Sequence, residues 1–183
     1  KLSENNTLEV AYGRGLRSAN MIERYINHFS VGQDPFEYVG NPNLDAEVNN
    51  QFEVGFKGRK RFEKGIDALR YSISGYYSLY ENYIVAVVDP TLDRKFMPNA
   101  QPQEVKRFIN LDKAYKTGFE AEAAIDFATY FDFSTAFSYV YSRNKDLDES
   151  LPLTPPLTTR LGLGFEKEKF WASLDYTITS KQD

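Results

Sequence analysis

The sequence has 183 residues, a net charge of −4 and no cysteine. This length suffices for one domain with a hydrophobic core, the mild acidity offers no basic surface to a nucleic acid, and disulfides and thiolate metal sites are excluded. Phenylalanine (14 residues) and tyrosine (13 residues) are abundant, and both favour β-strands. The longest apolar run, at residues 84–88, is far shorter than the roughly 20 residues of a membrane-spanning helix.

Alternation of apolar and polar residues predicts about seven β-strands along the chain. Each predicted strand has one face rich in phenylalanine and tyrosine and an opposite face of charged or small residues. In chain order, the strands are expected at residues 7–15, 51–57, 68–83, 118–127, 130–142, 157–167 and 170–179. One short helix is expected in a loop at residues 18–29, where apolar residues including Met21, Tyr25 and Phe29 have helical spacing.

The connections between the predicted strands alternate in length. Long segments, such as 14–48 and 82–106, alternate with tight ones, such as 128–130. Outer-membrane barrels have this asymmetry, and strands of about ten residues match the 9–11 tilted residues that cross a bilayer. Tyrosines near strand ends are typical of the aromatic girdles at membrane interfaces; they are at residues 76, 77, 80, 83, 139 and 141. The expected fold is all-β, a segment of an antiparallel, up-and-down transmembrane β-barrel.

One motif, NPNLDAE, stands between a long loop and a strand with two different faces. Its residues are Asn41, Pro42, Asn43, Leu44 and Glu47, with Asp45 and Ala46 between them. Pro42 cannot donate a ladder hydrogen bond and restricts Asn41 to extended conformations, and Asn43 suits a turn. We expect this motif to set the register of the strand, because a slip of one residue would place Glu53, instead of Phe52, in hydrocarbon.

The segment GNPNLDAEVNNQFEVGFKG resembles part of TonB-dependent outer-membrane receptors, where an N-P-x-L-x-x-E element of an extracellular loop leads into a barrel strand. Four further segments resemble strands and loops of that family in the same order: AYGRGLRSANMIERY, YSISGYYSLYENYIV, INLDKAYKTGFEAEAAIDF and LPLTPPLTTRLGLGFE. The resemblance implies a barrel of about 22 strands around a plug domain. Residues 1–183 would then be a partial barrel domain, from which the plug and the final strands are absent.

The resemblance also implies a function. The protein would be a receptor in the bacterial outer membrane for TonB-dependent active uptake of a metal or metal complex, such as siderophore-bound iron, haem, cobalamin or copper. Its partners would be outer-membrane lipid, a small metal-complex ligand, and the TonB–ExbB–ExbD complex acting through the missing plug. Two other interpretations remain open, a soluble β-domain that binds carbohydrate or protein and a passive porin-like barrel.

The candidate substrate-binding residues lie in the predicted long loops, which hold the only histidine, His28, and both methionines, Met21 and Met97. Thioether and imidazole groups suit copper, and the segments RSANMIERYINHF and RKFMPNAQP resemble a subgroup of copper receptors. At helical spacing, Met21 also fits the apolar core of a folded loop. No catalytic set accompanies the single histidine, so neither enzymatic activity nor a cofactor is expected.

Overall fold

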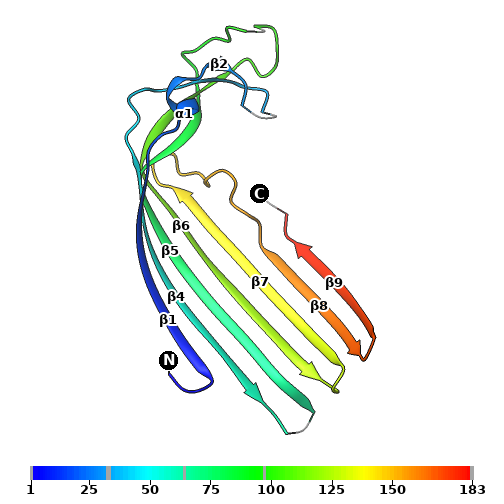
Figure 1. Ribbon diagram of the computed structural model, residues 1–183. Helices are drawn as coiled ribbons and strands as arrows, with labels where there is room; N and C mark the ends of the chain where they lie inside the picture. Colours follow the sequence, from blue (N-terminus) through cyan, green and yellow to red (C-terminus); the bar gives the residue numbers. More distant parts are fainter. Residues whose placement is uncertain (1, 32–33, 64, 97, 182–183) are drawn as a thin grey trace.

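The computed structural model describes residues 2–31, 34–63, 65–96 and 98–181, which form a nine-stranded sheet and one short helix. Seven long strands follow one another in the order β1-β4-β5-β6-β7-β8-β9, each antiparallel to its neighbours (Figure 1). They are β1 (Asn6–Arg17), β4 (Glu47–Arg61), β5 (Ile66–Asp89), β6 (Val105–Phe127), β7 (Phe131–Asn144), β8 (Thr158–Lys167) and β9 (Phe170–Thr179). The all-β, up-and-down architecture and the seven predicted strands are confirmed.

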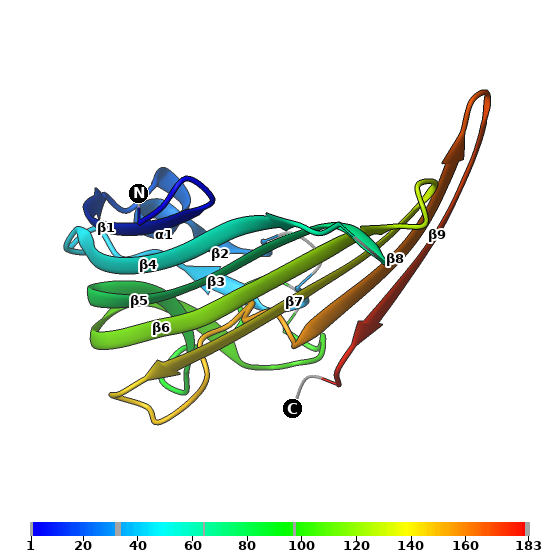
Figure 2. The ribbon, with the colours of Figure 1, turned by 90° about the horizontal axis from the view of Figure 1, so that it is seen from below.

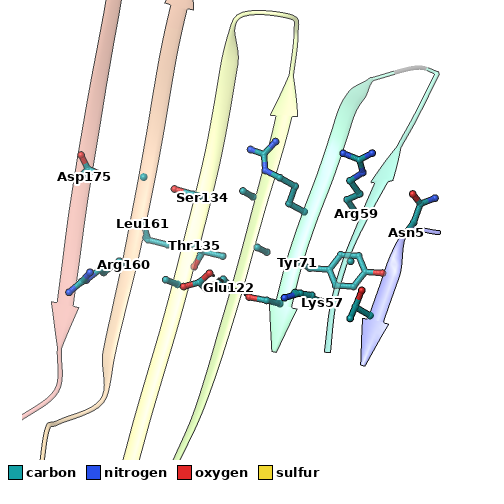
Figure 3. A pocket seen from close by; sticks show the side chains of 18 of the residues that line it. Asn5, Lys57, Arg59, Tyr71, Glu122, Ser134, Thr135, Arg160, Leu161 and Asp175 are labelled. Carbon is teal, nitrogen blue, oxygen red and sulfur yellow. Dashed lines mark hydrogen bonds between the residues drawn. The ribbon is translucent and has the colours of Figure 1, made fainter. Parts of the chain in front are cut away.

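The sheet curves (Figures 1 and 2), and polar and charged side chains line its concave face. A hollow on this face is lined by side chains from all seven long strands, including the charged residues Lys57, Arg59, Glu122, Arg160 and Asp175 (Figure 3). Lys57, Glu122 and Arg160 lie in one cross-strand row of the pairing register. The charged face of the predicted alternation is therefore the inner wall of a barrel segment.

The opposite, convex face is apolar and exposed. Its strongly exposed residues come from strands along the whole sheet and include Leu8, Val10, Tyr12, Phe52, Val54, Ile73, Phe119, Leu163, Leu174 and Ile178. Buried apolar side chains are few, and most of them lie near the long loops. Because a soluble sheet would cover such a face with a second layer, this surface fits contact with lipid.

The predicted tyrosine girdle is only partly right. Tyr77, Tyr139 and Tyr141 lie on the convex face, but Tyr76 and Tyr80 lie on the concave one. Tyr76 packs against Gly118, where an added Cβ would lie 2.7 Å from the tyrosine ring. Consecutive tyrosines in a strand must alternate between faces, so a cluster in the sequence divides between lipid and lumen.

The two ends of the sheet differ as predicted. The turns at residues 62–65, 128–130 and 168–169 are short, whereas the loops at 18–46, 90–104 and 145–157 are long and gather at the other end (Figure 1). The helix α1 (Met21–Tyr25) is preceded by the N-cap residue Asn20, whose side chain forms a capping box with Glu23. It is shorter than predicted, because Ile26 is already extended and Phe29 belongs to the short strand β2 (Asn27–Phe29).

Candidate functional site

The long loops at residues 18–46 and 90–104 fold together on the projecting end of the β5–β6 hairpin, and we call the described part of this unit the cap. The hairpin continues beyond its neighbours, because β4 begins at Glu47 and β7 ends at Asn144. In the first loop, β3 (Glu37–Val39) pairs with β2 and runs parallel to β6. This loop leaves β1, reaches β6 and returns to β4.

Glu37 is the central buried group of the cap. It is 2% exposed, and its carboxylate accepts hydrogen bonds from the backbone nitrogens of Lys95 (2.8 Å) and Phe96 (2.9 Å) in the second loop. His28 Nδ1 lies 3.0 Å and Arg94 Nε 3.4 Å from the same carboxylate. Burial opposes ionisation of Glu37, but the hydrogen bonds from Lys95, His28 and Phe96 and the charge of Arg94 outweigh it and lower its pKa.

A second carboxylate, Asp34, ties the first loop to β6. It accepts hydrogen bonds from the Tyr38 hydroxyl (2.6 Å), Lys106 Nζ (2.9 Å) and the backbone nitrogen of Phe36 (2.9 Å). Lys106 Nζ also lies 4.0 Å from the centre of the Phe36 ring, a cation–π contact. Burial raises the pKa of Asp34, but these hydrogen bonds and the Lys106 charge together lower it below its usual value.

Glu47 connects three elements where the cap meets the barrel wall. Its Oε2 accepts hydrogen bonds from Arg17 Nη2 at the end of β1 (3.1 Å) and from the backbone nitrogen of Ile84 in β5 (3.1 Å). Arg17 Nη1 also pairs with Glu23 Oε1 of α1 at 2.9 Å. The acidic end of the NPNLDAE motif therefore lies at the junction of β1, α1, β4 and β5.

The remainder of this motif packs against α1. Arg24 donates hydrogen bonds to the carbonyl oxygens of Pro42 and Leu44, and Leu44 is 3% exposed. The backbone nitrogen of Asn41 donates to the Glu23 carbonyl at 2.9 Å. Gly40 lies so close to the helix that an added Cβ would be 2.5 Å from the Arg24 carbonyl carbon, so this position requires glycine.

The three candidate substrate-binding residues have different surroundings. Met21 lies on α1 and is 73% exposed, so it is not the core residue that helical spacing also allowed. The side chain of His28 is 14% exposed and uses Nδ1 for Glu37. Met97 lies outside the described residues. Within the described part of the chain, no three His, Cys, Asp or Glu side chains gather closely enough to hold a metal ion.

The buried polar network of the cap could not be inferred from the sequence. Glu37 and Lys95 are 58 positions apart and Asp34 and Lys106 72 apart, and each pair connects segments with no regular period. The folding of the first loop onto β6 brings the partners together. A local signal would have been the Asp34–Pro35–Phe36 turn, in which the Asp34 side chain bonds the Phe36 nitrogen.

Two aromatic bands bound the convex face. Phe131 and Tyr141 are ten positions apart on β7, which corresponds to about 33 Å along the strand and about 23 Å across a membrane at a tilt of about 45°. Phe127 stacks on Phe131 at the short-turn end, and Tyr115 packs against Tyr141 at the cap end. This spacing matches the apolar band of about 25 Å on outer-membrane barrels. These features define a segment of a membrane-spanning barrel with an ordered loop cap.

Comparison with known proteins agrees with the assignment of the chain to a membrane-spanning barrel. The family model for the TonB dependent receptor-like β-barrel matches residues 1–183, and the chain belongs to this family. Among helices in the described residues, none has the length and apolar character needed to cross a membrane. No curated protein matches the sequence.

Several solved structures share the fold. The copper transporter OprC has a TM-score of 0.77 and 19% identity over 100% of this chain and 25% of its own. The siderophore receptor PirA from Pseudomonas aeruginosa has a TM-score of 0.72 and 22% identity, covering 98% of this chain and 32% of its own. A double mutant of the Serratia marcescens hemophore receptor HasR, in complex with HasA and heme, has a TM-score of 0.71 and 18% identity, covering 97% of this chain and 31% of its own. The chain thus spans a quarter to a third of the length of these proteins.

Proposed function

We propose that this chain is part of an outer-membrane receptor for TonB-dependent uptake of a metal or metal complex. One observation carries the proposal: a sheet with a lipid-compatible convex face and a charged concave wall supports an ordered cap at its long-loop end. In such barrels the long loops are extracellular, so the cap would meet the ligand. Energy for import would come from the TonB–ExbB–ExbD complex, acting through a plug inside the polar wall.

The cap offers a surface suited to a metal complex with an organic part. Met21 and Phe29 are 73% and 69% exposed, and the Phe29 ring lies 6.3 Å from that of Phe96. Thioether and imidazole groups could contact copper directly, and exposed aromatic rings could contact a chelator. Copper is therefore one candidate among the metals, supported by Met21, His28 and Met97 and by the likeness to OprC.

We also propose that the motif Asn41, Pro42, Asn43, Leu44 and Glu47 fixes the register with which β4 starts. The contacts of Arg24 with Pro42 and Leu44 hold the loop, and the bond from Ile84 holds Glu47. A slip of one residue would break both sets of contacts and exchange the lumen and lipid faces of β4.

The test is uptake of isotope-labelled copper and of iron chelates by cells that carry the full-length receptor, with and without functional TonB. The variants Met21→Leu and Met97→Leu remove the thioethers at nearly constant volume, and His28→Asn removes the imidazole. Leu153→Ala, in the loop after β7 where Leu153 is 96% exposed, is the matched control. We expect TonB-dependent uptake of at least one of these metal forms.

Two results are informative about the ligand. Copper uptake that falls about tenfold or more in the methionine variants, but not in Leu153→Ala, would identify the cap as a copper-binding surface. Iron-chelate uptake without copper uptake would leave Met21, His28 and Met97 as ordinary loop residues. Uptake of these metals that does not depend on TonB would contradict the proposed transport mechanism.

A further inference from the structure

Two phenylalanine rings from different loops meet on the surface of the cap. Phe29 ends β2 in the first loop and Phe96 lies in the second, and their ring centres are 6.3 Å apart with an interplanar angle of 64°. Phe29 is 69% and Phe96 53% exposed. This edge-to-face arrangement leaves part of each ring face open to a further aromatic group, and adjacent exposed apolar side chains are typical of an interaction site.

One buried carboxylate connects the backbone segments that carry the two rings. Glu37 Oε1 accepts a hydrogen bond from the backbone nitrogen of Phe96 at 2.9 Å. Glu37 Oε2 lies 3.0 Å from Nδ1 of His28, the residue before Phe29, and also accepts a hydrogen bond from the backbone nitrogen of Lys95. Each ring is therefore attached to a backbone position next to, or at, a group that binds Glu37. The distance between the two loops at this point depends on a single side chain.

Strand pairing fixes the position of Glu37 itself. Its strand β3 pairs with β2 on one side and with β6 on the other, where Glu37 is opposite the fully buried Val105. The next residue, Tyr38, packs its ring against that of Phe108 with ring centres 5.7 Å apart. A contact surface that is already ordered loses little conformational entropy when a ligand binds. The two exposed rings are therefore pre-organised for binding.

We propose that Phe29 and Phe96 bind an aromatic group of the transported metal complex, and that Glu37 is the positioning residue that keeps the two rings together. This inference rests on the proposed function and narrows the ligand to a metal chelate that carries an aromatic ring. Such a ring would stack on the open faces at ring-centre distances of about 4.5–7 Å. A bare metal ion or an aliphatic chelate would gain nothing from stacking on this pair.

The test measures equilibrium binding to the purified full-length receptor in neutral detergent by isothermal titration calorimetry. The ligands are the ferric complexes of enterobactin and of pyochelin, which carry aromatic rings, and ferrichrome, a ferric chelate without an aromatic ring. Phe29→Leu, Phe96→Leu and the double variant remove the rings but keep the apolar character and the charge of the cap, so a loss of affinity reports the rings. Phe62→Leu is the matched control, because Phe62 is an exposed phenylalanine in the turn at the opposite end of the sheet.

We expect at least one aromatic chelate to bind the parent and Phe62→Leu equally. It should bind each single variant of the ring pair about 2- to 12-fold more weakly, the change that corresponds to one lost aromatic contact. Unchanged affinity in the double variant, or an equal loss of affinity for ferrichrome, would overturn the proposal, and so would a parent that binds neither aromatic chelate. Because the assay has no transport step, its failure is distinct from a failure of TonB-dependent uptake.

A double-mutant cycle tests the role of Glu37. Glu37→Gln should weaken binding of the aromatic chelate about 2- to 12-fold in the parent but little in the Phe29→Leu/Phe96→Leu background, because Glu37 acts through the two rings. An effect of equal size in both backgrounds would show that Glu37 stabilises the cap as a whole, and it would overturn the positioning role.

Discussion

At the scale of single residues, the cap depends on a few buried charges whose partners come from distant parts of the chain. The Glu37 carboxylate accepts two backbone hydrogen bonds from the loop between β5 and β6, and Arg94, whose side chain is 5% exposed, lies beside it. Arg94 Nη1 also donates to the carbonyl oxygens of Pro35 (3.0 Å) and Pro102 (2.6 Å). The Glu37 carboxylate thus accepts hydrogen bonds from the backbone nitrogens of Lys95 and Phe96, which have no partner in a strand or helix.

Replacement of Glu37 by glutamine should loosen the second loop without unfolding the barrel. The amide has one acceptor oxygen where the carboxylate has two, and it leaves Arg94 without its counter-charge. We expect amide hydrogen exchange at Lys95 and Phe96 to accelerate about 5- to 150-fold, corresponding to about 1–3 kcal/mol for buried donors that lose their acceptor. The control Asp148→Asn, at an exposed ion pair, should change these two amides little. Unchanged exchange in Glu37→Gln would show that the loop is held by other contacts.

The same carboxylates predict a pH dependence of cap order. The pKa values of Glu37 and Asp34 are lowered in the folded protein from ordinary values of 4.5 and 3.8. Groups with a lowered folded pKa stabilise the structure fully above their unfolded pKa, and this contribution is lost as the pH falls through the folded value. The cap should therefore stay ordered from pH 7 to 4.5 and open at lower pH, as measured by hydrogen exchange corrected for its intrinsic pH dependence. Opening above pH 5 would assign the transition to other groups.

At the scale of elements, each long strand must keep one face in lipid and the other toward the lumen. On β6, Ala121 is on the convex face between Ile73 and Phe137, about midway between the two aromatic bands, and its neighbour Glu122 lines the concave hollow. Adjacent positions of one strand therefore have opposite requirements, which gives a direct test of the orientation of the sheet.

Ala121→Arg should destabilise the barrel by about 2–4 kcal/mol, because it places a charge near the middle of the hydrocarbon. Glu122→Arg, one position away, keeps a charged side chain at the polar wall and should cost much less. The measurement is urea unfolding of the full-length receptor in lipid vesicles. A second readout is the faster-migrating band that a folded barrel gives on a denaturing gel when the sample has not been heated. Equal destabilisation by the two variants would contradict the assignment of the convex face to lipid.

The sequence was sufficient to predict the membrane-spanning part of these strands, because period-two alternation is a local signal and persists over about ten residues. It missed the projecting ends of β5 and β6, which continue to Asp89 and begin at Val105, whereas the predicted strands covered only residues 68–83 and 118–127. The structure of the cap, in contrast, could not be predicted from the sequence. β2 and β3 have three residues each, too few for any period, and β3 exists only because β6 offers a partner. The motif residues Leu44 and Glu47 were recognised from their pattern, but their contacts with Arg24 and Arg17 depend on the path of the loop. Likewise, helical spacing suggested Phe29 as part of the helix, whereas the structure places it in β2.

At the scale of the whole molecule, the described strands form an open sheet whose outer strands are β1 and β9. Such edges present unpaired backbone groups, and the exposed convex face is apolar from β1 to β9. We expect the segment 1–183, produced alone in detergent-free buffer, to aggregate or to form oligomers through its edges, and to disperse when detergent covers the convex face. Size-exclusion chromatography with light scattering checks this, and a monodisperse monomer without detergent would contradict a membrane-facing surface.

The parallel pairing of β3 with β6 affects the order in which the protein can fold. Glu37 pairs with Val105 and Val39 with Arg107, although the loop that contains β3 joins β1 to β4. The first loop therefore cannot reach its final form when only β1 and β4 have paired, because it also needs β6 in place. Because such distant contacts form slowly, ordering of the cap should be a late event, after the wall beneath it is complete.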